Sequence, residues 1–183
     1  LNLIRRAKAL GDFVIVADYL PDCPGKDIAD VHVPVSTFDA EGVIRAGQEH
    51  GIQAIVTTGT DQPVLTAARA AEALGLPFYM DSRTALAFTN KRVMKALFRE
   101  HHIPANDSVL IGREYIPQEI GGIRFPAVMK PVDSQGQRGI YLVDEPVSVD
   151  RHIRDTLGYS REDKALLETY YKSDEITVNG WVA

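Results

Sequence analysis

The sequence has 183 residues, 45% hydrophobic and 25% charged, and its 20 Lys and Arg against 25 Asp and Glu give a net charge of -5. This composition excludes collagen-like, disordered and disulfide-scaffold classes, and the length suits one large domain or two small ones. Without a basic excess, nucleic acid is not expected as a partner. The apolar runs are too short for a membrane partner, and a single cysteine, Cys23, predicts a reducing, cytoplasmic location.

The first half of the chain alternates between strand and helix signals, which predicts an α/β fold with a doubly wound parallel sheet and helices on both faces. The helices are recognised by one apolar face and by a glycine at the end, and the strands by short β-branched runs. The expected helices are 1–11, 39–50 and 61–74, and the expected strands are 12–17, 31–35, 54–57 and 76–80.

The pattern changes near Thr89, where we set a boundary between domains at 1–88 and 89–183. Thr89 and Asn90 offer the N-cap of a helix that ends at His101 and His102. These adjacent histidines face apart, which suits a helix end better than a metal site. The rest is predicted to be an α+β unit with strands 109–111, 126–130, 140–143, 165–171 and 176–182 and a helix at 149–157.

The most unusual segment is the polar loop between the expected strands 126–130 and 140–143. It is longer than a hairpin needs. Its glycines let backbone N–H groups surround an anion, Arg138 adds a fixed positive charge, and Lys130 ends the preceding strand. These features favour a polyphosphate site, and the alternative is a mobile surface hairpin with a solvated lysine and arginine.

Two carboxylates follow at the expected strands near the end of the chain. Glu168 lies in an apolar strand, where it can accept a hydrogen bond from an exocyclic amine while the following backbone pairs with ring nitrogens. Glu175, at a strand start, can accept from two adjacent hydroxyls. The alternative is that both are edge-strand charges that discourage aggregation.

The ordered combination of these motifs resembles the ATP-grasp superfamily, most of all its branch of carbamoyl-phosphate synthetase large chains, biotin carboxylases and purine carboxylases. The resemblance covers nearly the whole chain. It implies a Rossmann-like pre-ATP-grasp domain at 1–88 and the N-terminal part of an α+β ATP-grasp domain at 89–183, with a lid at about 107–167. It is carried by Lys91 in Thr-Asn-Lys-Arg, Lys130 in Val-Met-Lys-Pro, the loop Asp-Ser-Gln-Gly-Gln-Arg-Gly, and Glu168 followed by Glu175.

The resemblance implies that Lys91 and Lys130 bind the phosphates of ATP, with Lys130 also close to the adenine. The loop has fewer glycines than that of biotin carboxylase, so its closure is expected to be stiffer or differently triggered. The loop residues implied to cover the β and γ phosphates are Ser134, Gln135, Gly136, Gln137, Arg138 and Gly139.

The resemblance also implies the contacts of the base and the ribose. Ile140 would pack on the base, and Glu168 would accept from the adenine amino group. The backbone of Thr169 and Tyr171 would pair with the ring edge, and Glu175 would bind the ribose hydroxyls.

Members of this family use Mg-bound ATP to phosphorylate a carboxylate, and an amine or similar nucleophile then attacks the acyl phosphate. The resemblance therefore implies a carbamoyl-phosphate synthase-like ligase whose ligands are ATP, Mg²⁺ and a small carboxylate, and which can form a homodimer. The family's metal ligands come after the strand equivalent to 176–182, so none is assigned here. We expect the chain to be the middle of a longer ligase, with no turnover by itself.

Three alternatives stay open. A dinucleotide-binding Rossmann-type domain would use Asp18, just after a strand, for ribose hydroxyls, although Asp18 also suits the start of a turn. The second alternative is a non-catalytic nucleotide-binding module, and the third is another branch of the family. For the acceptor substrate, the expected contacts are at a helix start that faces the strand ends, where an ordinary helix cap is the alternative. These residues are Gly59, Thr60, Asp61 and Gln62.

Overall fold

The computed structural model describes residues 1–174 and 176, and the chain divides into two compact units, Leu1–His101 and His102–Ala183. We describe each unit by itself. The boundary expected near Thr89 was set by the change in sequence pattern, and it stays a prediction. Nearly all of the expected strand 176–182 lies outside the described residues.

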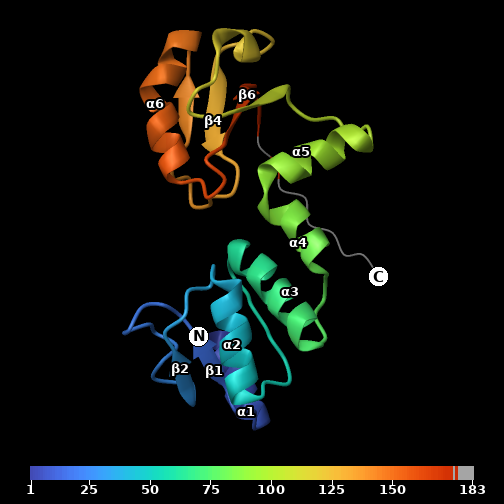
Figure 1. Ribbon diagram of the computed structural model, residues 1–183, viewed down its shortest axis with the longest axis vertical. Helices are drawn as coiled ribbons and strands as arrows, with labels where there is room; N and C mark the ends of the chain where they lie inside the picture. The colour runs from blue at the N-terminus through green and yellow to red at the C-terminus, as the bar shows by residue number, and fades with distance from the viewer. Residues whose placement is uncertain (175, 177–183) are drawn as a thin grey trace. The chain divides into compact units, whose positions relative to one another are not determined.

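The first unit combines a small parallel sheet with five helices. In the sheet, β1 (Ile15–Ala17) pairs with β2 (Val31–Val33). Helices α2 and α3 pack side by side, and α4 packs against α3 (Figure 1). The helices are α1 (Asn2–Leu10), α2 (Ala40–His50), α3 (Gln62–Leu74), α4 (Ser82–Thr89) and α5 (Lys91–Glu100).

The ends of these helices follow the signals in the sequence. Asp39 caps α2 by accepting a hydrogen bond from the backbone N–H of Gly42 at 2.9 Å. Asn90 caps α5 by accepting from the N–H groups of Arg92 at 3.0 Å and Val93 at 3.2 Å. Gly51 ends α2 with a φ of 59°, in the left-handed region that favours glycine. The helices expected at 1–11, 39–50 and 61–74 are confirmed.

Two expected strands of this unit do not form. Residues 54–57 and 76–80 take part in no ladder in the described part of the chain. An apolar run becomes a strand only where a neighbouring strand accepts its ladder hydrogen bonds, and Val56 is instead 67% exposed. Helix α4 was also missed, although Asp81 caps it by accepting from Thr84 N–H at 2.6 Å. The doubly wound sheet is therefore not confirmed.

In its described residues, the second unit is a four-stranded antiparallel sheet with one long helix. The strand order is β3-β6-β4-β5, and α6 lies along one face (Figure 1). The strands and the helix expected between 109 and 171 are confirmed, with ends that differ by a few residues. The elements are β3 (Ser108–Ile111), a 3-10 helix (Pro117–Ile120), β4 (Ala127–Pro131), β5 (Tyr141–Val143), α6 (Pro146–Gly158) and β6 (Ala165–Thr169).

The core of the second unit lies between the sheet and α6. Because side chains alternate along a strand, every second residue of β4 and β6 points toward the helix. Met129 and Leu167 are fully buried there against α6 residues such as Ile153. This packing fixes which face of the sheet is left for a ligand.

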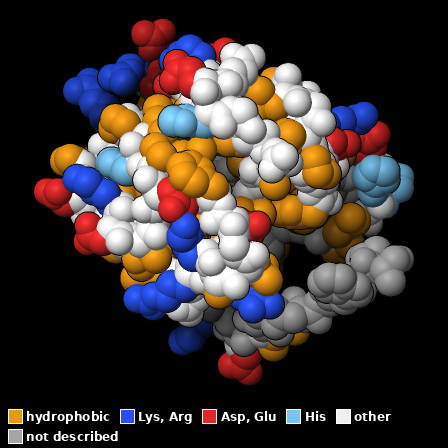
Figure 2. Space-filling model, turned by 90° about the horizontal axis from the view of Figure 1, so that it is seen from below, with side chains coloured by type: hydrophobic (Ala, Val, Ile, Leu, Met, Phe, Trp, Pro, Cys, Tyr) orange, Lys and Arg blue, Asp and Glu red, His pale blue; other side chains and the backbone are white. Residues whose placement is uncertain are grey.

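The surface mixes apolar and charged side chains, as the view in Figure 2 shows. In the first unit the most exposed large apolar side chains include Phe13, Val56 and Tyr79. None of the helices in the described part of the chain has the length and apolar content that crossing a bilayer requires.

Candidate functional site

Lys130 and Glu168 lie on one face of the sheet in the second unit. Val128 is opposite Glu168 in the β4–β6 ladder and Leu166 is opposite Lys130, so all four side chains point away from α6. Lys130 Nζ forms an ion pair with Glu168, whose side chain is only 7% exposed, whereas that of Lys130 is 24% exposed. Since burial of a carboxylate is costly unless a cation is near, the lysine stabilises this glutamate within the sheet. We call this side of the sheet the Lys130 face.

Apolar side chains lie beside the pair on the Lys130 face. Leu110 of β3 is 38% exposed and Leu142 of β5, opposite Val128, is 54% exposed. Ile140 is 41% exposed, and the β4–β5 register continued by one residue sets it beside Lys130. Exposed aliphatic side chains next to a buried carboxylate form a surface that can accept a flat aromatic ring bearing an amine.

The expected phosphate loop leaves β4 beside this pair. Its tip, formed by Gly136, Gln137 and Arg138, is exposed. Gly136 has a φ of 69°, and open space lies where a side chain would be, so the backbone can be approached closely by an anion. Gln137, the next residue, has a φ of 59°. A non-glycine residue therefore adopts the left-handed conformation here, and a glycine at this position would be less constrained.

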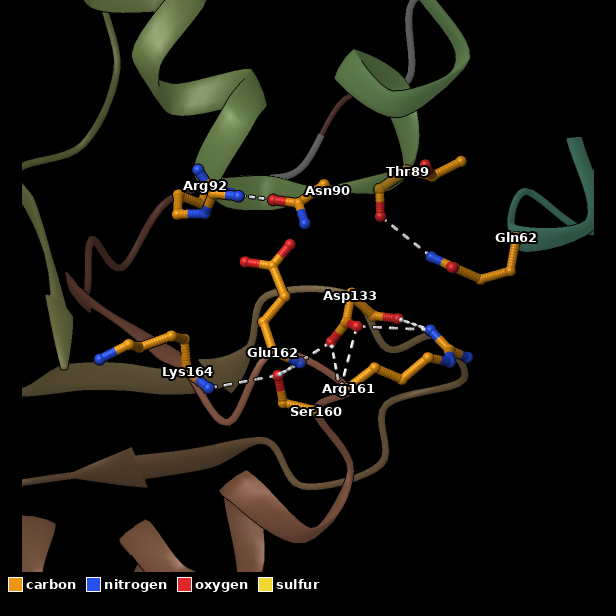
Figure 3. Close-up of polar contacts among 9 residues, drawn as sticks. All are labelled: Gln62, Thr89, Asn90, Arg92, Asp133, Ser160, Arg161, Glu162 and Lys164. Carbon is orange, nitrogen blue, oxygen red and sulfur yellow. Dashed lines mark hydrogen bonds and ion pairs between the residues drawn. The ribbon is translucent and has the colours of Figure 1, made fainter. Parts of the chain in front are cut away.

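Both ends of the loop contact the end of α6 and the turn after it. Asp133 accepts hydrogen bonds from Ser160 Oγ at 2.9 Å and from the backbone N–H of Arg161 at 3.0 and 3.1 Å (Figure 3). At the other end, Thr156 Oγ1 donates to the carbonyl of Gly139 at 3.0 Å. The carboxylate of Asp133 is therefore engaged in holding the loop rather than available to a metal.

The first residue of β5 is fixed by α6. The Tyr141 hydroxyl donates a hydrogen bond to Asp155, and its ring stacks on His152 with the centroids 4.2 Å apart. The hydrogen bond to the carboxylate raises the pKa of Tyr141 above its ordinary value, so the hydroxyl keeps its proton.

The backbone after β6 is held by its neighbours. The Thr169 N–H donates to the carbonyl of Asp107 at 3.0 Å, and the Thr169 carbonyl accepts from Asn106 Nδ2 at 3.4 Å. Arg124 donates to the Tyr171 hydroxyl and lies 5.4 Å from the centre of its ring. Because the Thr169 N–H is already hydrogen-bonded to Asp107, only the Thr169 carbonyl is left for the pairing expected with the edge of the adenine ring.

Of the four residues expected to converge on a nucleotide, the structure brings Lys130 and Glu168 together. Lys91 is the first residue of α5, in the first unit. Glu175 lies outside the described residues. The roles of both stay predictions.

The expected acceptor contacts lie at the start of α3. Gln62 is 7% exposed and donates through Nε2 to the carbonyl of Thr89 at 2.9 Å, which ties α3 to the end of α4 (Figure 3). Gly59, Thr60 and Asp61 are exposed. The Gln62 side chain thus has a structural contact, and the three residues before it are the accessible part of this segment.

Two other expectations concern acidic groups. Asp18 accepts from the Leu20 N–H at 2.9 Å, which is the turn role considered for it. Among residues 1–174 and 176, no group of three or more His, Cys, Asp or Glu is arranged to hold a metal ion.

The sequence reasoning missed Thr156, Ser160 and Arg161, which hold the loop. They lie 17 to 28 residues from their partners, and no local spacing signals such contacts. Leu110 and Leu142 were also missed, although strand alternation with Lys130 in register could have assigned them to the Lys130 face.

Comparison with known sequences gives a partial match. No protein-family model matches the chain. A D-alanine–D-alanine ligase of Jannaschia sp. (strain CCS1) is 30% identical over 96 residues, which is 52% of this chain and 28% of that protein.

Solved structures match over most of the chain. The L-amino acid ligase from Bacillus licheniformis has a TM-score of 0.70 and 19% identity, over 92% of this chain and 41% of that one. The biotin carboxylase domain of the Hydrogenobacter thermophilus 2-oxoglutarate carboxylase, solved with MgADP and bicarbonate, has a TM-score of 0.70 and 19% identity over 93% and 42%. N5-carboxyaminoimidazole ribonucleotide synthetase from Thermotoga maritima has a TM-score of 0.60 and 19% identity over 91% and 42%.

These similarities cover less than half of each of those proteins. The relatives named are ATP-grasp ligases. The resemblance found in the sequence is thereby confirmed at the level of the fold, which combines a parallel and an antiparallel sheet with helices.

Proposed function

Since the chain has the fold of the ATP-grasp ligases, we propose that it is the ATP-binding part of an ATP-dependent carboxylate–amine ligase. The observation that carries this proposal is the Lys130–Glu168 ion pair on an apolar sheet face beside a polar, glycine-containing loop. The ADP bound in a biotin carboxylase domain of the same fold supports a nucleotide as the ligand.

In this proposal the adenine ring packs on Ile140 and Leu142 of the Lys130 face. Its exocyclic amine donates to Glu168, while Lys130 contributes positive charge to the α and β phosphates. The loop residues 134–139 close over the terminal phosphates through backbone N–H groups and Arg138. Lys91 and Glu175 are proposed for the phosphates and the ribose on the family resemblance alone.

The proposed reaction transfers the terminal phosphoryl group of ATP to a small carboxylate, and an amine then displaces phosphate from the acyl phosphate. Phosphoryl transfer needs positioning and charge neutralisation more than covalent help from the protein, which suits a lysine, an arginine and loop amides. We assign no step to magnesium.

The finer assignments follow the resemblance. We propose a Rossmann-like pre-ATP-grasp domain at 1–88 and a carbamoyl-phosphate synthase-like branch. The accessible residues Gly59, Thr60 and Asp61 are the proposed acceptor contacts. A homodimer is proposed as well, since the biotin carboxylase domain named above is a dimer. A cytoplasmic location stays a prediction from the single cysteine.

The proposal is tested by titrating the chain with a non-hydrolysable ATP analogue, with and without Mg²⁺, in a calorimeter. Lys130→Met should weaken binding about 10- to 100-fold, since a hydrogen bond to a charged group contributes about 1.5–3 kcal/mol. The matched control is Arg154→Met, which removes one positive charge from the exposed side of α6 on the opposite face of the sheet. No binding by the wild-type chain, or equal loss in both variants, would contradict the proposal.

A further inference from the structure

One short segment of the second unit holds both ends of the polar loop. This segment, residues 156–161, comprises the last residues of α6 and the turn after it. We call it the loop anchor. It contacts Asp133 at the start of the loop and Gly139 at its end, while the residues between them include the exposed tip 136–138.

At the first contact Asp133 is nearly buried, with 7% exposure. Besides the hydrogen bonds from Ser160 Oγ and Arg161 N–H, the Arg161 guanidinium donates to the Asp133 carbonyl at 2.8 Å (Figure 3). Ser160 Oγ also accepts from the backbone N–H groups of Glu162 at 3.3 Å and Lys164 at 3.4 Å. The turn is therefore hydrogen-bonded to both the side chain and the backbone of Asp133, and these bonds set the direction in which the loop leaves β4.

At the second contact Gly139 lies directly against the end of α6. A Cβ at this position would come within 2.7 Å of Tyr159 Cδ2 and 3.3 Å of Thr156 Cα. The φ of Gly139 is 67°, so both its backbone conformation and its closeness to the helix require glycine. Thr156 is fully buried, and its hydroxyl donates to the Gly139 carbonyl at 3.0 Å.

The loop anchor is packed into the core beneath the Lys130 face. Leu157 packs in the core with Met129, the β4 residue next to Lys130. The two ends of the loop are thus held near the lysine by packing and hydrogen bonds, and the residues between them are left to close over a ligand. Fixed ends lower the conformational entropy lost on closure.

We propose that the loop anchor sets the position from which the loop closes over the nucleotide phosphates, and that Thr156 and Ser160 are positioning residues for phosphate binding. This inference rests on the proposed function of the Lys130 face. It assigns a role in nucleotide binding to two side chains that do not touch the nucleotide themselves.

The test uses two variants of the full chain, one at each end of the loop. Thr156→Val removes the hydroxyl and keeps the shape, and Thr156→Ser is its matched control because it keeps the hydroxyl. Ser160→Ala removes the hydroxyl at the Asp133 end. Two measurements are made on each folded variant: the dissociation constant for a non-hydrolysable ATP analogue, and the rate of tryptic cleavage after Arg138, the exposed arginine of the tip.

Thr156→Val should weaken binding of the ATP analogue by about 3- to 10-fold, the effect of one lost hydrogen bond. Ser160→Ala should weaken it by at least as much, because the Ser160 hydroxyl also accepts from the Glu162 and Lys164 N–H groups. Both variants should also speed cleavage after Arg138 without changing cleavage at other sites, whereas Thr156→Ser should resemble the wild type. A role in overall stability alone would raise cleavage at all sites together.

Wild-type affinity and cleavage in both folded variants would overturn the proposal. If Thr156→Val does not fold, Ser160→Ala decides by the same two measurements. Failure of the proposed function gives a different result: the wild-type chain then binds no ATP analogue at all, while faster cleavage after Arg138 in the variants still reports a loop held by its anchor.

Discussion

The Lys130–Glu168 pair allows nucleotide binding to be separated from folding stability. If the pair exists for binding, replacing both residues by apolar ones should leave a stable protein that no longer binds ATP. We consider three variants: Lys130→Met, Glu168→Leu, and the double variant.

The side chain of Lys130 is 24% exposed and that of Glu168 is 7% exposed. This difference determines which single variant is expected to lose more stability. Lys130→Met takes the cation away from a nearly buried carboxylate, which costs about 3–5 kcal/mol in a fully buried pair and about 2–3 kcal/mol here, where water reaches the lysine. Glu168→Leu leaves an ammonium that can turn to solvent, so its cost should be about 1 kcal/mol or less. The double variant should lie within about 1 kcal/mol of the wild type.

The assay is hydrogen exchange of the backbone amides of β4 and β6, which reports the opening free energy of the second unit separately from the first. Calorimetric titration with the ATP analogue accompanies it. A double variant destabilised by the sum of the two single changes would refute the reasoning, since the pair would then not be coupled. A double variant that retains ATP binding would refute the assigned role of the pair.

Three further predictions concern stability alone. Leu167→Ala, in the fully buried core of the second unit, should lower its free energy of unfolding by about 2–5 kcal/mol in urea denaturation, and a loss below 1 kcal/mol would contradict the described core. Gly47→Ala would place a Cβ 2.7 Å from Leu74 Cδ1 and 3.0 Å from Ile52 Cδ1, so it should lower the melting temperature of the first unit although alanine favours helix; a higher melting temperature would show that these two side chains shift at little cost. The pKa of Asp30 is lowered by hydrogen bonds from Lys8 and from the Val14 N–H, so its stabilising effect is present above the unfolded value near 3.8 and is lost as pH falls through the folded value. Asp30→Asn should therefore reduce the drop in melting temperature between pH 6 and pH 2.5, and an unchanged drop would exclude this ion pair as a cause.

Much of the second unit could be predicted from its sequence. Its strands are short runs with apolar residues on both faces, and Lys130 and Glu168 interrupt those runs on the side away from α6. A polar residue at such a position is expensive to bury unless a ligand or a partner requires it, so the interruption itself signals a site. The family resemblance assigned both residues to one nucleotide site, but their ion pair was not predicted and depends on the register of β4 and β6.

The first unit was harder to predict because strands depend on partners that lie far away in the sequence. The runs at 54–57 and 76–80 have suitable residues, yet they form no ladder in the described part of the chain. Helix α4 was missed because it is only 8 residues long and adjoins a second helix at Asn90. The loop anchor could not be predicted for the same reason of distance: Asp133 and Arg161 are separated by 28 residues.

The most direct test of the central claim is to follow the backbone amide resonances of the chain by NMR while ADP is added. The account predicts chemical-shift changes at Lys130, Leu142 and Glu168 and in the loop 134–139, all of which belong to the Lys130 face or its phosphate loop. Changes confined to the surroundings of Asp18 would favour the dinucleotide-binding alternative. The absence of any change at the Lys130 face with ADP in excess would contradict the account.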